Sequence, residues 1–168
     1  MSVEGGYGMA ETFETKHKNL SGIWFFGLAG AGKTFASHFC SSFIENAFVI
    51  DGDEVRKLVS FDLDYSMSDR KVQLRRVYGL AQIAKNNDRF PIVSTVTMTE
   101  EIYKKCIEVN IDVVQIIRPL DQLNKVRKIY ETDQNVVGKN IQLVELNTIK
   151  FHNNGDQAFE EALEKYVK

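Results

Sequence analysis

Residues 23–34 of this 168-residue chain read IWFFGLAGAGKT. The first four residues form a short aromatic and β-branched run, which is typical of a buried strand. The last eight, from Gly27 to Thr34, match the pattern G-x-x-x-x-G-K-[ST] at every fixed position. Apolar residues then recur at helical spacing from Phe35 to Phe43. A strand, a glycine-rich turn and a helix in this order predict a loop that binds phosphate.

The chemistry of this loop follows from its residue types. Backbone N–H groups in the glycine-rich turn can point at the oxygens of a β-phosphate, and the dipole of the following helix favours negative charge there. The lysine is expected to bridge the β- and γ-phosphates, and the threonine hydroxyl is expected to ligate Mg²⁺. The alternative is a glycine-rich turn that caps a helix beside a solvated lysine. The residues predicted to bind ATP are Gly27, Gly30, Ala31, Gly32, Lys33 and Thr34.

Further apolar runs alternate with helical patterns along the rest of the chain. Continuous apolar strands separated by helices indicate a parallel sheet that is covered on both faces, the doubly wound α/β class. In the longest helix the apolar residues expected to face the core are Val72, Val77, Leu80, Ile83 and Ala84. We expect strands at 47–50, 90–96, 111–117 and 148–151, and helices from an N-cap at Ser68 to about Asn87 and at 100–109, 118–131 and 156–167.

The length suits one domain. We expect a flexible tail at 1–19, a single domain at 20–168, and a functional loop, or lid, at about 132–142. Arg127, Lys128 and Lys139 flank or belong to this loop, and each is either a contact of the closed site or a solvated charge.

Composition excludes several classes of function. The chain has 21 Lys and Arg against 23 Asp and Glu, so no overall positive field favours nucleic acid. No apolar run approaches the roughly 20 residues that span a bilayer, and no leader opens the chain. We therefore expect a cytoplasmic protein that binds no membrane, with Cys40 and Cys106 as buried reduced thiols. Oligomeric state, a homodimer included, is left open.

The kind of nucleotide-binding protein can be narrowed further. A guanine-selecting N-K-x-D pattern is missing, because residues 124–127 read NKVR, with arginine in the place of the carboxylate. The chain is also too short to add the oligomerisation and sensor parts of an ATPase motor. A small-molecule kinase remains.

Acidic residues follow the second strand directly. Asp51 and Asp53 are expected to face the phosphates, because the carboxyl ends of adjacent parallel strands share one crevice. One such acid can accept the proton of an attacking hydroxyl or hold Mg²⁺ through water, and Arg56 can bind a second anion. The alternative is a turn followed by a helix with solvated charges. Tyr65 is either a platform for a base or a core residue, and Arg70 either binds a substrate phosphate or pairs with a surface acid.

These motifs together resemble the adenylylsulfate (APS) kinase family over about residues 17–76. The resemblance is carried by the strand and phosphate loop, by D-G-D-x-x-R at 51–56, by L-x-Y-S-x-x-x-D-R at 63–70 and by R-R-V at 75–77. It implies a three-layer α/β/α kinase of the P-loop type, with about five mostly parallel strands and a short lid. It also implies Mg²⁺-assisted transfer of the γ-phosphoryl of ATP to the 3′-hydroxyl of a nucleotide.

The resemblance further implies roles for individual residues. The two aspartates serve the metal and the acceptor hydroxyl, with Asp53 beside Thr34 at the metal, and Lys33, Asp51 and Asp53 form the catalytic set. The arginines hold the phosphate-bearing part of the acceptor, and the tyrosine stacks on its base. The residues implied to bind the acceptor are Asp53, Arg56, Tyr65, Arg70, Gln73, Val96, Thr97 and Val136.

Departures from the family pattern cluster on the acceptor side. The family reads phenylalanine-isoleucine-serine-proline where this chain has Thr95-Val96-Thr97-Met98. It has asparagine at Gln73, lysine at Asp121 and the lid phenylalanine at Val136. A relative that phosphorylates another nucleotide, such as cytidine diphosphoramidate, therefore fits at least as well as one that uses adenylyl sulfate. The competing hypothesis is a catalytically silent ATP-binding module.

Overall fold

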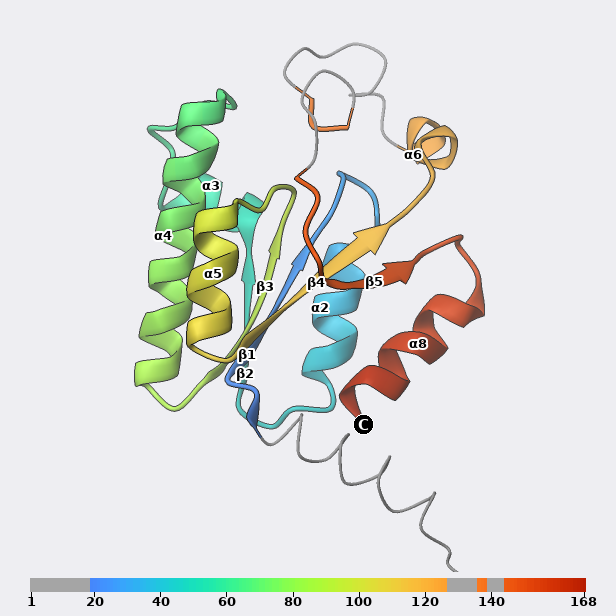
Figure 1. The fold of residues 1–168 in the computed structure, drawn as a ribbon, viewed down its shortest axis with the longest axis horizontal. Coiled ribbons are helices and arrows are strands. Elements are labelled where there is room, and N and C mark those ends of the chain that lie inside the picture. The colour runs from blue at the N-terminus through green and yellow to red at the C-terminus, as the bar shows by residue number, and fades with distance from the viewer. Residues whose placement is uncertain (1–18, 127–135, 139–143) are drawn as a thin grey trace, which may run out of the picture.

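The computed structural model describes residues 19–126, 136–138 and 144–168. These residues form a five-stranded sheet in the order β2-β3-β1-β4-β5, and each pair of neighbouring strands is parallel (Figure 1). The predicted α/β class and strand number are confirmed. The strands are β1 (Gly22–Phe26), β2 (Ala47–Asp51), β3 (Phe90–Thr95), β4 (Ile111–Ile117) and β5 (Ile149–His152).

The central strand shows why the sheet needs helices on both faces. Every residue of β1 is buried. Trp24 and Phe26 point into one core cluster, whereas Ile23 and Phe25 point into the other. Because successive side chains of a strand face opposite ways, a strand that is apolar throughout stays out of water only between two helical layers.

Helices supply these two layers. Two of them, α2 (Lys33–Ser41) and α8 (Gln157–Val167), pack in the cluster that contains Phe25. The other cluster is covered by α3 (Gly52–Leu58), α4 (Met67–Asn86) and α5 (Glu100–Glu108). The short helix α6 (Leu120–Val126) follows β4 (Figure 1). The molecule is therefore the three-layer α/β/α arrangement that the sequence indicates.

Strand order corrects one expectation. We expect β1 and β2 to be neighbours from the sequence, but β3 lies between them. The ends of all three strands are nevertheless level, since Phe26 pairs with Thr95 and Asp51 pairs with Ser94. Residues that follow β1 and β2 thus share one edge of the sheet across the end of β3.

The longest helix also differs in detail from its prediction. Its N-cap is Ser66, whose hydroxyl accepts a hydrogen bond from the Asp69 N–H at 3.3 Å, and not Ser68. The side chain of Ile83 is 60% exposed, so it does not belong to the core as predicted. Arg70 and Gln73 are buried on this helix instead. The first turns of α4 therefore turn polar side chains toward the pocket, while Leu74 packs in the apolar core.

The helix expected at 118–131 begins at Leu120, and its predicted residues beyond 126 lie outside the described part of the chain, as do 1–18 and most of the loop at 132–142. Within the described residues, no helix has the length and apolar character that crossing a bilayer requires. Cys40 and Cys106 are free and buried, as predicted, and burial raises the pKa of each thiol to about 12.

Candidate active site

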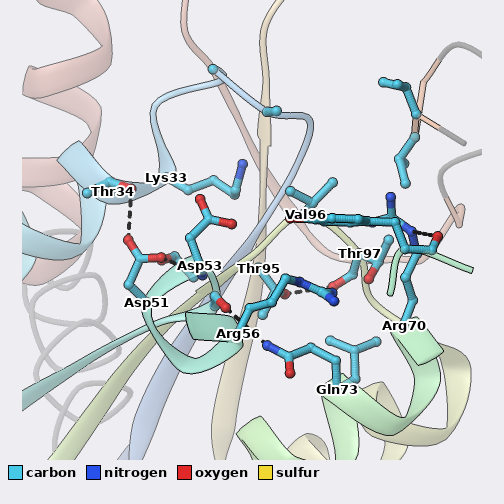
Figure 2. Close-up of a pocket in the computed structure, with 18 of the residues that line it drawn as sticks. Lys33, Thr34, Asp51, Asp53, Arg56, Arg70, Gln73, Thr95, Val96 and Thr97 are labelled. Carbon is cyan, nitrogen blue, oxygen red and sulfur yellow. Dashed lines mark hydrogen bonds between the residues drawn. The ribbon is translucent and has the colours of Figure 1, made fainter. Parts of the chain in front are cut away.

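A pocket of about 740 Å³ opens at the carboxyl ends of the strands (Figure 2). Its walls come from the phosphate loop, the start of α3, the segment before α4, the first turns of α4 and the end of β3. Residues from five regions of the sequence, 29–35, 51–56, 64–74, 94–97 and 136–137, therefore meet here. The predicted site residues that line the pocket are Gly30, Gly32, Lys33, Thr34, Asp51, Asp53, Arg56, Tyr65, Arg70, Gln73, Val96, Thr97 and Val136.

The phosphate loop is held by hydrogen bonds of its own. The amide of Ala31 donates to the carbonyl of Leu28 at 3.0 Å, and Lys33 Nζ donates to the same carbonyl at 2.7 Å. Gly32 has a left-handed φ of 108°, and a Cβ built on it would lie 2.5 Å from Asn153 Nδ2. That position therefore needs glycine on both conformational and steric grounds.

Two predicted ATP contacts, Gly27 and Ala31, are buried and do not line the pocket. A Cβ on Gly27 would come within 2.3 Å of the Ile116 carbonyl oxygen, so this glycine lets β1 pass close to β4. Asn153 Nδ2 donates to the Ala31 carbonyl at 2.7 Å, which ties the loop to the end of β5. Both residues shape the loop from behind.

Asp51 occupies the junction between the phosphate loop and α3. One carboxylate oxygen accepts from the amide of Asp53 at 2.8 Å and so caps the helix. The other accepts from the Thr34 hydroxyl at 3.2 Å. Figure 2 shows the side chains of Lys33 and Asp53 pointing into the same part of the pocket. The cradle and the paired acids thus face one space.

These side chains fit Mg²⁺ in kind. A threonine hydroxyl and carboxylates are hard oxygen donors, and Mg²⁺ is usually held by one or two such side chains together with waters and substrate phosphates. In the parts of the chain that the structure describes, no group of three or more His, Cys, Asp or Glu side chains could form a protein-only metal cage. Thr34, Asp51 and Asp53 therefore match a metal bound jointly with phosphate.

Two arginines flank Tyr65 on the other side of the pocket. The guanidinium carbon of Arg56 lies 4.4 Å from the centre of the tyrosine ring, and that of Arg70 lies 5.3 Å from it. Arg56 also donates to the carbonyl of Asp64 at 2.8 Å, and Arg70 Nε donates to the carbonyl of Tyr65 at 2.9 Å. The backbone thus fixes both cations next to one aromatic ring.

The exposure of these side chains argues against one alternative for each residue. Tyr65 is 55% exposed, so it is not a core residue. Arg70 is only 8% exposed and lies within the pocket wall, so it is not a surface residue. Burial, together with the nearby charge of Arg56, lowers the pKa of Arg70. A bound anion would relieve the repulsion between these two cations, which makes this part of the pocket suited to phosphate or sulfate.

The remaining walls contain predicted residues together with others that sequence reasoning did not single out. Gln73 Nε2 donates to the Gly52 carbonyl at 3.0 Å, which places this predicted residue under the acid step. Val136 packs with Leu28 and Leu123 above the phosphate loop. Arg127, Lys128 and Lys139 lie outside the described residues. The unpredicted lining residues are Ala29, Phe35, Gly52, Asp64, Ser66, Leu74, Ser94, Thr95 and Val137.

Several known proteins that resemble this chain are adenylyl-sulfate kinases. Residues 20–121 match the family model described as adenylylsulphate kinase. The adenylyl-sulfate kinase of Picosynechococcus is 29% identical over 66% of this chain and 65% of its own length. That of Buchnera aphidicola is 28% identical over 48% of this chain and 41% of its own length. The chain thus spans less than two thirds of these relatives.

Solved structures show the same fold. The APS kinase of Mycobacterium tuberculosis, in complex with AMPPNP and APS, superposes with a TM-score of 0.71. The match covers 86% of this chain and 94% of that one at 22% identity. At this identity the likeness establishes the fold and no more.

Proposed function

Because the chain belongs to the adenylylsulphate kinase family, we propose that it transfers the γ-phosphoryl group of ATP to the 3′-hydroxyl of a small nucleotide. One observation carries the proposal: the phosphate loop, the acids of the D-G-D step and the Arg56 and Arg70 pair all line one pocket. A kinase needs this combination, since it must hold a triphosphate and an anionic acceptor in line.

The loop side of the pocket holds the triphosphate. Loop amides and the N-terminus of α2 stabilise the β-phosphate, and Lys33 leaves the Leu28 carbonyl to bind the β- and γ-phosphate oxygens. Thr34 with Asp53 would hold Mg²⁺, which supplies charge neutralisation of the phosphates when bound. Asp51 keeps the Thr34 hydroxyl and the first turn of α3 in register.

The acceptor side supplies the attacking oxygen. Asp53 accepts the proton of the acceptor's 3′-hydroxyl while the oxygen of that hydroxyl forms a bond to the γ-phosphorus. The bond between the γ-phosphorus and the β–γ bridging oxygen breaks at the same time, which leaves ADP. Arg56 and Arg70 hold the phosphate-bearing part of the acceptor, and Tyr65 stacks on its base. Catalysis is thus positioning together with electrostatic stabilisation.

The acceptor is adenylyl sulfate or a different nucleotide such as cytidine diphosphoramidate. Val136 stands where the family pattern has the lid phenylalanine, so one aromatic of a base sandwich is replaced by an aliphatic side chain. Losing that stacking partner costs on the order of 1–3 kcal/mol of binding energy for a base. This departure favours an acceptor that depends less on stacking than adenylyl sulfate does.

ADP release in the presence of Mg²⁺·ATP tests the proposal, with adenylyl sulfate and cytidine diphosphoramidate compared side by side. The wild-type protein should release ADP only when one of these acceptors is present. Lys33→Ala and Asp53→Ala should each lower turnover by about three powers of ten or more without unfolding the chain. Lys71→Ala, an exposed lysine of α4 outside the pocket, is the matched control. ATP binding without acceptor-dependent ADP would instead indicate a silent module.

A further inference from the structure

A buried hydroxyl at the end of β3 connects the core to the wall of the pocket. Trp24 Nε1 lies 2.8 Å from Thr95 Oγ1, and Thr95 Oγ1 lies 2.6 Å from the carbonyl oxygen of Thr97. An indole N–H only donates and a carbonyl only accepts, so the direction of both bonds is fixed. The Thr95 hydroxyl accepts a hydrogen bond from the Trp24 indole and donates a hydrogen bond to the Thr97 carbonyl.

This relay is shielded from water. Trp24 is 0% exposed and Thr95 is 6% exposed. Hydrogen bonds in such surroundings are strong, and one bond polarises the next along a chain. If the hydroxyl were removed, the indole N–H and the carbonyl would each lose this partner in a place that water reaches poorly.

The relay holds a segment that the sheet does not. Because β3 ends at Thr95, the residues that follow receive no bonds from the strand ladder. Val96 and Thr97 nevertheless line the pocket, and Figure 2 shows them beside Thr95 on the same wall as Arg70. The hydrogen bond to the Thr97 carbonyl therefore fixes the backbone of the wall to which Arg70 also belongs.

The backbone of Thr95 contacts the opposite wall of the pocket, which the phosphate loop forms. Its carbonyl accepts a hydrogen bond from the amide of Gly27 at 3.3 Å, at the entry to the phosphate loop. The side chain and the main chain of one residue thus contact different halves of the site. A change of side chain alone should disturb one half and spare the other.

We propose that Thr95 is a positioning residue for the acceptor: its hydroxyl, held by Trp24, keeps the Val96–Thr97 segment in place against the acceptor nucleotide. This inference rests on the proposed function, because it takes the acceptor to bind along that segment. Phenylalanine, which the family pattern has at position 95, can make neither hydrogen bond. The relay therefore belongs to the features by which this chain departs from the pattern on its acceptor side.

Three variants test the relay. Thr95→Val keeps the shape and removes the hydroxyl, and Thr95→Ser keeps the hydroxyl. Thr148→Val is the matched control, because the Thr148 hydroxyl is buried, has no hydrogen-bond partner among the described residues and lies outside the pocket. Calorimetric titration gives separate Kd values for AMP-PNP and for adenylyl sulfate or cytidine diphosphoramidate, whichever binds the wild-type protein more tightly.

Thr95→Val should weaken acceptor binding about tenfold or more, as the loss of a buried hydrogen bond predicts. AMP-PNP should bind within about twofold of wild type, and Thr95→Ser should restore acceptor binding to within about threefold. Trp24 is the one tryptophan of the chain, so its emission maximum should move in Thr95→Val and stay in Thr95→Ser. The control should change neither Kd.

The opposite results separate the possible failures. Unchanged acceptor binding in Thr95→Val, an equal loss of AMP-PNP, or an unmoved tryptophan emission would overturn the positioning role. A wild-type protein that binds AMP-PNP but neither acceptor would overturn both this inference and the proposed acceptor. A wild-type protein that binds an acceptor without turnover would refute the kinase activity alone, and the comparison of Thr95 variants would still stand.

Discussion

Two substitutions by uncharged residues can separate the two roles of Asp51, as a helix cap and as a negative charge beside the phosphates. Its carboxylate caps α3 through the Asp53 amide at 2.8 Å and accepts from the Thr34 hydroxyl at 3.2 Å. Serine is as good an N-cap as aspartate, whereas alanine is not a cap. Asp51→Ser therefore removes the charge and keeps the cap, and Asp51→Ala removes both.

The expected magnitudes follow from these contacts. Loss of the cap costs about 1 kcal/mol of unfolding free energy, and the long bond to Thr34 adds little because it is exposed. For a chain of this length, that loss lowers the Tm of Asp51→Ala by about 2–4 °C, whereas Asp51→Ser should stay near wild type. Both variants lose the negative charge beside the phosphates, so kcat should fall about 100-fold or more in each.

Thermal unfolding and acceptor-dependent ADP release, measured on the same preparations, check this pair. The reasoning is refuted if Asp51→Ser keeps wild-type kcat, because the charge would then have no part in the reaction. It is equally refuted if the alanine and serine variants unfold at the same temperature, since a capping side chain at position 51 would then add nothing to stability.

Other predictions concern residues away from the acids. Asn153→Ala removes the bond to the back of the phosphate loop and should raise the Kd for ATP about tenfold in a titration, with acceptor binding unchanged; equal loss of both would argue against it. The hydrogen bond from Arg76 lowers the pKa of Asp62 in the folded protein below its ordinary value of 3.8. The ion pair therefore contributes its full stabilisation above pH 3.8, and this stabilisation is lost as the pH falls through the lower pKa of the folded state. In urea unfolding at a series of acid pH values, the free energy of unfolding should therefore decline less steeply with falling pH for Asp62→Asn than for wild type. Identical slopes would show that the Asp62–Arg76 pair does not contribute to the acid sensitivity of the fold. Burial raises the pKa of Cys40 and Cys106 to about 12, so a thiol reagent should label neither in the native protein and both in denaturant; fast native labelling would contradict this.

Local patterns predicted the parts of the fold that local physics determines. The phosphate loop could be found because glycine, lysine and threonine at this fixed spacing between a strand and a helix rarely have a function other than phosphate binding. The number of strands followed from continuous apolar runs. The order of the strands did not, because pairing of β3 between β1 and β2 joins residues far apart in the chain.

The candidate site was predicted in its composition and only partly in its contacts. Val77 and Ala84 of the predicted apolar stripe on α4 are buried, whereas Ile83 is exposed. Arg70 and Gln73 lie outside that stripe and are buried because they face the pocket, which no local pattern shows. Ser66 and Ser68 are equally good caps by composition, and only the backbone geometry distinguishes them. Thr95 was named only within a family comparison, since its hydroxyl has a partner 71 residues away and no sequence pattern marks such a bond.

In the proposed reaction the phosphate loop and the D-G-D step act on one pair of bound substrates. Phosphorus NMR of the wild-type protein with Mg²⁺·ATP and each acceptor nucleotide tests this directly. We predict that one acceptor gives ADP together with a new phosphomonoester signal coupled to the proton at its 3′ carbon. Spectra in which ATP binds and neither acceptor ever gains that signal would contradict the account.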